Sequence, residues 1–440
     1  MKPTRRGLLA GGAALIAGCT RDNQRDSGDT GERIGADWRD AEPERWEPEE
    51  PVDLEVFAWG LRISDATTST ALVSVRSGAE SVEVRVAEAG GEGWTVVHSE
   101  ETAETVLKLS GLVADTAYNV VLVADGVRSE TARFRTAISS SEDRLVVIGA
   151  TSCLGATNKP WPCLSHAALE DLDVFLLLGD TIYADSSTYE GYTEEWGVAV
   201  EVGKGLYDLQ LSTSFVHTWD DHEVANNWYE GDNVTTEWVE NARNAYRDHL
   251  PWEGSLYRVL SWGNVVDLIV LDSRGERIRD ERYLSPEQMA WLKETLSSSQ
   301  ARFKVILNSV PVTDLDLLFG TVERADRWMG YQADRDEILE YVDSEGIPGV
   351  VWVAGDLHYG ALNYVGKPGE VGADQFEVMA GPAGSRLNPL PGLFEGDDQF
   401  PILLSTWNYV RLECDPVLGT VFVRFIGDDG AVLAEQELAI

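Results

Sequence analysis

The sequence predicts a layered α/β domain preceded by a small all-β sandwich. Between about residues 142 and 440, short apolar runs alternate with stretches of helical periodicity, as in α/β layers. One run, Val174–Leu178, has no polar alternation and is followed by Gly179-Asp180, which indicates a strand buried on both faces with a carboxylate at its end. From about residue 52 to 140 the runs are shorter and separated by turn residues. A chain of 440 residues, 43% of them hydrophobic, can fold into both parts.

Residues 1–19 have the composition of a secretory signal peptide. A basic head with Arg5 and Arg6 precedes an acid-free apolar run that is too short to stay in a membrane. The paired arginines resemble a twin-arginine signal, and Ile16–Cys19 resembles a lipobox whose cysteine is lipidated after cleavage. A general secretory signal with an incidental cysteine is the alternative. We therefore expect an exported bacterial protein, a periplasmic or cell-surface lipoprotein anchored through Cys19.

Residues 20–51 differ from everything that follows them. They are mostly charged and polar, with almost no aliphatic side chains, so they bury too little apolar surface to offset the entropy of folding. We expect a disordered acidic tether between the anchor and the folded part.

Residues 52–140 contain regularly spaced alternating or β-branched runs, and no cluster of catalytic residue types. The segment Leu109–Tyr118, followed by Phe134–Thr136, resembles the tyrosine-corner segment and last strand of a fibronectin type III-like sandwich. The predicted strands are Leu54–Trp59, Thr70–Val75, Val82–Val86, Trp94–Val97, Thr105–Leu109, Tyr118–Val123 and Thr131–Thr136.

Residues 142–440 carry one well-marked helix start and a strand-rich end. Ser285-Pro286 supplies a cap and a proline at the first helical position, and apolar residues follow at helical spacing. The runs Ile402–Leu412, Thr420–Ile426 and Val432–Leu438 predict antiparallel strands joined by Gly- and Asp-rich turns, which complete a sheet.

Four apolar runs of this domain end in residue types that bind metals. Leu145–Cys153 ends in a cysteine, and Val174–Tyr183 ends in Gly-Asp and a tyrosine. Phe215–Glu223 ends in acids and a histidine, and Val350–His358 ends in Gly-Asp and a histidine. The carboxyl ends of parallel strands meet at one edge of a sheet. The sequence therefore predicts a metal site at that edge.

Five motifs in this order resemble the alkaline phosphatase D (PhoD-like) family over nearly the whole mature chain. They are Ser152-Cys153, Gly179-Asp180-x-x-Tyr183, Trp219–Asn227, Asp272-x-Arg274 and Gly355-Asp356-x-His358. The resemblance implies a calcineurin-like metallophosphatase fold, a four-layer αββα sandwich, that hydrolyses phosphate esters with iron and calcium.

The resemblance also assigns roles to single residues. The ferric iron (Fe3+) ligands would be Cys153, Asp180, Tyr183 and His358. Asp180 would bridge to calcium (Ca2+), which Asp356 and one residue of Asp221–Asn227 would also bind, with Asn227 preferred to Asp221. His222 and Arg274 would lie over the phosphate as catalytic groups beside Asp180.

Phosphate esters are anionic and repel an incoming hydroxide, so two cations that neutralise the oxygens and activate a water suit their hydrolysis. We expect a metal-activated hydroxide to attack phosphate monoesters, diesters or both. A phospholipase-type phosphodiesterase and a non-catalytic anchored binding module on a phosphatase scaffold are the alternatives. The loops Ala184–Gly203 and Leu387–Gln399 are expected to select the substrate.

Each candidate residue has a structural alternative. Cys153 could form a disulfide with Cys163 in an oxidising compartment, and a Cys163–Cys414 bond stays open. Tyr183 could be a packed aromatic residue, and His222 and His358 could be core histidines. Four histidines without a partner motif are expected to be structural: His98, His166, His217 and His249.

The formal net charge of −40 at pH 7 argues against a nucleic-acid-binding surface, because so acidic a chain lacks a basic face to release counterions. The expected partner is a phosphate ester, and we expect a monomer.

Overall fold

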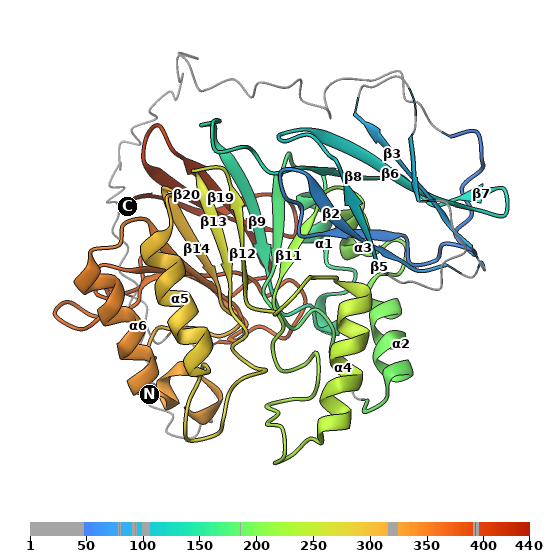
Figure 1. Ribbon diagram of the computed structural model, residues 1–440. Helices are drawn as coiled ribbons and strands as arrows, with labels where there is room; N and C mark the ends of the chain where they lie inside the picture. The colour runs from blue at the N-terminus through green and yellow to red at the C-terminus, as the bar shows by residue number, and fades with distance from the viewer. Residues whose placement is uncertain are drawn as a thin grey trace, which may run out of the picture. The chain divides into compact units, whose positions relative to one another are not determined.

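The computed structural model describes residues 48–440 apart from 78, 80, 90–92, 94, 99–105, 185, 316–323, 390–391 and 393–395. The predicted signal peptide and lipobox, and the predicted tether up to residue 47, lie outside the described residues. All described residues belong to one compact unit (Figure 1). Within this part of the chain, no helix has the length and apolar character needed to cross a membrane.

Two large sheets form the middle of the molecule. Among the described residues, the nine-stranded sheet has the order β21 (Val432–Ala439), β20 (Thr420–Gly427), β19 (Asn408–Asp415), β9 (Val146–Thr151), β10 (Val174–Leu177), β11 (Phe215–His217), β1 (Leu61–Ser64), β2 (Thr70–Val75), β5 (Val106–Ser110). The seven-stranded sheet has the order β12 (Arg258–Trp262), β13 (Val266–Val270), β14 (Phe303–Leu307), β15 (Val350–Ala354), β17 (Phe376–Met379), β16 (Gly360–Tyr364), β18 (Ile402–Leu404). A core of buried apolar residues from both sheets fills the space between them.

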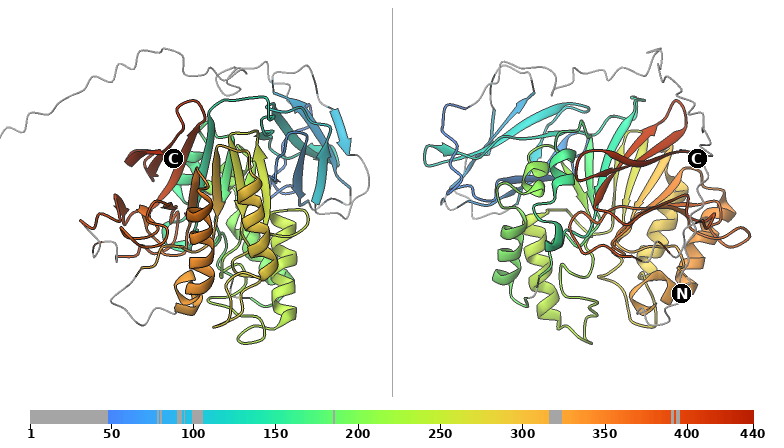
Figure 2. Two further views of the ribbon diagram at one scale, coloured as in Figure 1. Left: turned by 60° about the vertical axis from the view of Figure 1, so that its left-hand side comes forward. Right: turned by 180° about the vertical axis from the view of Figure 1, so that it is seen from behind.

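Helices cover the outer faces of the two sheets. The helices on the nine-stranded sheet are α1 (Pro162–Ala167), α2 (Tyr189–Ala199), α3 (Gly205–Gln210) and α4 (Thr236–His249), and those on the seven-stranded sheet are α5 (Pro286–Ser298) and α6 (Gln332–Glu345). Short 3₁₀ turns are η1 (Ala156–Asn158), η2 (Arg324–Asp326) and η3 (Trp328–Gly330). The α5–α6 pair and the α2–α4 pair lie on opposite sides of the strands (Figures 1 and 2). The predicted αββα sandwich is confirmed.

The local signals explain the main elements of this sandwich. All residues of Val174–Leu177 are buried, as the lack of polar alternation predicted. The hydroxyl of Ser285 accepts the N–H of Gln288 at 3.1 Å, so the predicted cap starts α5. Strands β9, β10 and β11 are parallel neighbours, and so are β13, β14, β15 and β17. The carboxyl ends of the parallel strands therefore lie at one edge of each sheet.

The all-β region is present and contains the predicted tyrosine corner. A five-stranded sheet of β4 (Thr95–His98), β3 (Glu83–Glu88), β6 (Ala117–Ala124), β7 (Val127–Arg128) and β8 (Ala132–Arg135) packs on β1, β2 and β5 around a shared core of described residues. The hydroxyl of Tyr118 accepts the N–H of Val113 at 2.9 Å. The predicted strand Leu54–Trp59 is wrong, because the carboxylate of Asp53 accepts the N–H of Glu55 at 2.8 Å and turns the backbone.

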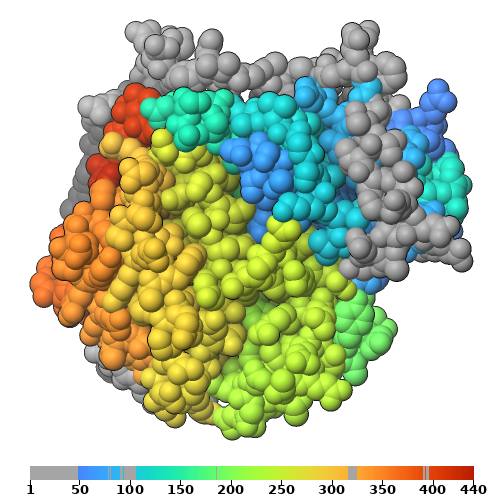
Figure 3. Space-filling model, viewed as in Figure 1, coloured from blue at the N-terminus to red at the C-terminus, as the bar shows by residue number. Residues whose placement is uncertain are grey.

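The all-β region is joined to the central sheet, so the predicted domain boundary at 140–142 does not separate two sheets. Strand β1 pairs with β11 through Ser64 and Phe215. The buried Arg62 donates to the carbonyl of His249 at 2.6 Å, and Arg258 forms an ion pair with Asp65 at 2.7 Å. The blue N-terminal residues accordingly lie directly against yellow-green residues of the larger part (Figure 3).

The predicted strand Ile402–Leu412 is two strands in different sheets. Strand β18 ends at Leu404 in the seven-stranded sheet, and β19 begins at Asn408 in the nine-stranded sheet. Between them, Ser405 donates to the carbonyl of Asn388 at 2.8 Å and Trp407 donates to the carbonyl of Ser385 at 2.9 Å. These bonds to a neighbouring loop draw the chain out of one sheet and into the other. The predicted antiparallel strands β19 to β21 are confirmed.

Candidate metal centre

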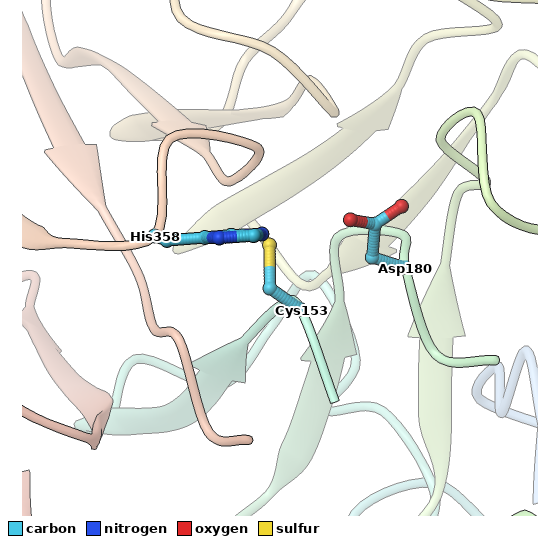
Figure 4. Close-up of side chains that lie close together, drawn as sticks. All are labelled: Cys153, Asp180 and His358. Carbon is cyan, nitrogen blue, oxygen red and sulfur yellow. The ribbon is translucent and has the colours of Figure 1, made fainter. Parts of the chain in front are cut away.

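The predicted ligands lie together at the carboxyl ends of β9, β10, β11 and β15. Cys153 follows β9, Asp180 follows β10, and His358 follows β15 of the other sheet. The sulfur of Cys153 points toward the imidazole of His358, with the carboxylate of Asp180 beside them (Figure 4). The two sheets therefore contribute to one site.

Asp180 belongs to two groups of metal-binding side chains. In the first group, Cys153, Asp180 and His358 each offer one ligand atom, and these three atoms lie within 4.8 Å of one another. The second group, Asp180, Asp221 and His222, meets the same distance. One carboxylate that is shared by two groups is the arrangement expected of a bridging ligand. This geometry agrees with the predicted bridge at Asp180.

Tyr183 lies in the first of these groups rather than in an apolar core. Its hydroxyl donates to Asp180 Oδ2 at 2.8 Å and lies 3.4 Å from His358 Nε2. Its ring packs against the ring of His222 with centroids 4.1 Å apart. The phenol oxygen is thus placed among the candidate ligands.

His358 has the tautomer that a metal ligand needs. Its Nδ1 lies 3.0 Å from the carbonyl oxygen of Arg386, which can only accept a hydrogen bond. The proton is therefore on Nδ1, and Nε2 presents a lone pair to the site. Burial lowers the pKa of His358, so the imidazole is neutral at physiological pH.

Burial and mutual repulsion favour a cation in this site. Burial, and then the charge of Asp221, raise the pKa of Asp180 well above its usual range. Burial, and then the charge of Asp180, raise the pKa values of Cys153 and Tyr183. A thiolate, a phenolate and carboxylates can share so small a volume only around positive charge. The donor set therefore fits the cations that the sequence resemblance implies.

Glu223 lies in the segment considered for the calcium ligand, but no role of its own was predicted for it from the sequence. Its carboxylate accepts the N–H groups of Asp180 and Asp220, each at 2.9 Å, and of Thr181 at 2.6 Å. It thereby ties the loop after β10 to the loop after β11. Burial raises the pKa of Glu223 to about 7, although these three hydrogen bonds oppose the shift. The only sequence signal was its place at the end of an acidic run.

Backbone strain concentrates on the candidate ligands. Of the ten described non-glycine residues with positive φ, five are predicted ligands: Cys153, Asp180, Asn227, Asp356 and His358. This conformation is unfavourable for residues with a Cβ, and it persists where surrounding structure holds it. The strand ends are therefore shaped for the site at some cost in backbone energy.

Arg274 does not lie over the candidate site, which corrects the sequence-based expectation. Its side chain has no exposed surface and donates to Asp220, and its Nη1 lies 2.5 Å from Asp326 Oδ1. Burial lowers the pKa of this guanidinium, but the neighbouring carboxylates outweigh burial and raise it above its usual range. Arg274 is a buried counter-ion beneath the site.

An open pocket of about 750 Å³ lies over the candidate ligands. Arg327 donates from Nε to Asp356 Oδ2 at 2.6 Å, and the N–H of Asn227 donates to Asp221 Oδ2 at 2.6 Å. The described residues that line it are Asp180, Asp221, His222, Asn226, Asn227, Arg327, Asp356, Leu357, His358, Arg386, Leu387, Asn388 and Pro389. Arg327 and Arg386, which no motif marked, are the arginines of this pocket.

The remaining expectations are resolved more simply. Cys153, Cys163 and Cys414 are free and buried, so neither considered disulfide is present. His217 and His249 are fully buried, and His217 Nδ1 lies 2.6 Å from the hydroxyl of Tyr246, in agreement with a structural role.

The two loops expected to select the substrate differ in structure. The first, residues 184–203, contains helix α2 and is not a loop throughout. In the other predicted loop, residues 387–389 line the pocket.

Comparisons with known proteins point to one family. The sequence model of the PhoD-like phosphatase family matches residues 200–389. Alkaline phosphatase D of Bacillus subtilis (strain 168) is 26% identical over 265 residues, which span 47% of this chain and 45% of that relative.

Two solved structures share the fold. One described as the structure of PhoD matches with a TM-score of 0.74 and 20% identity, over 87% of this chain and 89% of that one. The purple acid phosphatase PPD1 from yellow lupin seeds matches with a TM-score of 0.63 and 13% identity, over 86% and 73%. The resemblance carried by the motifs is thus confirmed: residues 200–389 match the PhoD-like phosphatase family model, and the chain shares the fold of PhoD.

Proposed function

We propose that this chain is a metal-dependent phosphoesterase that hydrolyses phosphate monoesters, diesters or both. The observation that carries the proposal is the carboxylate of Asp180, which two ligand groups share at the base of an open pocket. A carboxylate shared in this way would hold two cations, which would supply the charge neutralisation and water activation that phosphate-ester hydrolysis needs. The phosphatase family model and the phosphatase relative support the same chemistry.

The two ligand groups suit two different cations. Cys153, Tyr183 and His358 with Asp180 supply thiolate, phenolate and imidazole, which suits Fe3+. In the second group, Asp180 and Asp221 supply carboxylate oxygens, and Asn227 and Asp356 line the same pocket and add further oxygens, which together suit Ca2+. When bound, the cations would neutralise the phosphate oxygens and lower the pKa of a water molecule.

The protein's own groups have separate tasks around the substrate. The imidazole of His222 lines the pocket above Tyr183 and can give a proton to the leaving oxygen. Arg327, with Nε held by Asp356, can bind a phosphoryl oxygen with its remaining N–H groups. Arg327 thus takes the role that the sequence suggested for Arg274.

The proposal is tested by measuring product release from three substrates: p-nitrophenyl phosphate, bis(p-nitrophenyl) phosphate and phosphatidylcholine vesicles. The purified chain, loaded with iron and calcium, is expected to hydrolyse the monoester, the diester or both, to lose this activity on chelation and to regain it when both ions are restored. Hydrolysis of the vesicles alone would favour the phospholipase-type alternative. No hydrolysis of any substrate by the loaded protein would favour the binding-module alternative and overturn the proposal.

We also propose that the protein is exported by the twin-arginine route and anchored through Cys19, on the basis of the motifs at residues 1–19. A fatty acid analogue should label the wild type but not Cys19→Ala. The double replacement Arg5→Lys with Arg6→Lys should leave precursor in the cytoplasm. Equal labelling of Cys19→Ala would refute the anchor, and normal export of the double variant would point to the general secretory route.

A further inference from the structure

Residues 383–388, between β17 and β18, hold two of the candidate iron ligands by their backbone. Two N–H groups of this segment donate to the carbonyl oxygen of Cys153 at 3.0 and 2.9 Å. One of its carbonyl oxygens accepts from the ring of His358, and one of its N–H groups donates to the carbonyl oxygen of His358, each at 3.0 Å. These two ligands come from different sheets, and the segment links them.

Within this segment, Ser385 contacts the third ligand, Tyr183, through its hydroxyl. The two hydroxyl oxygens lie 2.5 Å apart. Tyr183 has one proton, which it donates to Asp180 Oδ2 at 2.8 Å, so Ser385 must be the donor of the shorter bond. The N–H of Gly155 donates to Ser385 Oγ at 3.1 Å, which leaves the serine proton to point at Tyr183.

Packing fixes the position of the Ser385 hydroxyl. The side chain is 3% exposed, and Trp407 donates to the carbonyl of Ser385 at 2.9 Å. A Cβ on Gly155 would lie 2.6 Å from Ser385 Oγ, and a Cβ on Gly384 would lie 2.2 Å from Nε1 of Trp161. Both glycines therefore permit the close approach of this segment to the loop after β9, and a side chain at Gly155 would collide with Ser385 itself.

We propose that Ser385 is a positioning residue of the metal centre, which fixes the phenol oxygen of Tyr183 by donating a hydrogen bond to it. The inference rests on the proposed function, because it assigns Tyr183 to the metal. A phenolate bound to a cation keeps lone pairs that accept a hydrogen bond, so the bond from Ser385 persists when Tyr183 gives up its proton. Such outer partners orient a ligand and tune how strongly it donates to the metal.

A double-mutant cycle on the full-length protein tests this inference. Ser385→Ala is expected to lower the affinity for iron, measured against a competing chelator, by about 10–100-fold. It should also shift the visible charge-transfer band that thiolate and phenolate ligands give to ferric iron. In a Tyr183→Phe background, Ser385→Ala should cause no further loss of iron, because the oxygen through which it acts is absent.

The control is Ser273→Ala, which removes another buried hydroxyl, 2.8 Å from that of Ser309 and outside the pocket lining. It should leave iron affinity and the band unchanged. Two results would overturn the role of Ser385 while leaving the metal centre intact. One is an equal effect of Ser385→Ala in both backgrounds. The other is an unchanged band and an unchanged iron affinity in the wild-type background. A wild-type protein that holds no iron after loading would overturn the proposed iron site, and the inference with it.

Discussion

Asp180→Asn is expected to cause the largest loss of activity of any single substitution in this chain. The amide cannot donate charge to two cations, so both ions should be released and phosphate-ester hydrolysis should fall by more than the roughly 100-fold typical of an outer partner. Metal analysis of the purified variant and its rate with p-nitrophenyl phosphate measure both effects.

Asp272→Asn is the matched control for this substitution. Asp272 is also buried at a strand end and accepts hydrogen bonds from Trp219 at 2.8 Å and from the N–H of Gly275 at 2.7 Å. It does not line the pocket. The control should therefore lose some stability but keep its metals. If Asp180→Asn keeps both ions, Asp180 is not a bridge, and the metal centre has been assigned wrongly.

Arg274→Met is expected to give a large loss of stability. It leaves the buried carboxylates of Asp220 and Asp326 without their shared partner, and breaking a buried ion pair in this way costs about 3–5 kcal/mol in the free energy of unfolding. Urea unfolding of the variant and the wild type measures this difference at pH 7.

The pH dependence of unfolding gives this prediction a second readout. Burial raises the pKa of Asp326, but the charges of Arg274 and Arg277 outweigh burial and hold it below its usual value of 3.8. A lowered pKa in the folded state stabilises the protein above the pKa of the unfolded chain, and this contribution is lost as the pH falls below 3.8. The free energy of unfolding should therefore fall less at acidic pH in Arg274→Met than in the wild type.

Arg327→Met provides the contrast, because Arg327 lines the pocket. It should lower the rate of hydrolysis with a smaller loss of stability than Arg274→Met. An Arg274→Met variant with wild-type stability and no activity would return the substrate-binding role to Arg274.

The strand ends of the site could be predicted because their signals are local. A buried apolar run followed by Gly-Asp, as at Val174–Asp180, depends on consecutive residues only. The direction of the Arg274 side chain could not be predicted in this way. It depends on Asp220 and Asp326, which are distant in the sequence and meet only after the two sheets pack together.

Residues that support the ligands were missed for a related reason. Glu223 acts by accepting backbone N–H groups, and Ser385 and Arg386 act from a segment with no marked motif. Backbone contacts leave little trace in the choice of side chains. The strand predicted at Leu54–Trp59 does not form, because the turn at Asp53 competes with the alternating pattern.

The pairing of β1 with β11 limits how this protein can be divided. A fragment that begins near residue 142 would leave the edge of β11 uncovered, just before Asp220 and Asp221. Open strand edges pair with other chains and aggregate. The two regions therefore form one structural unit, and a substitute for the all-β region would have to supply an equivalent strand beside β11.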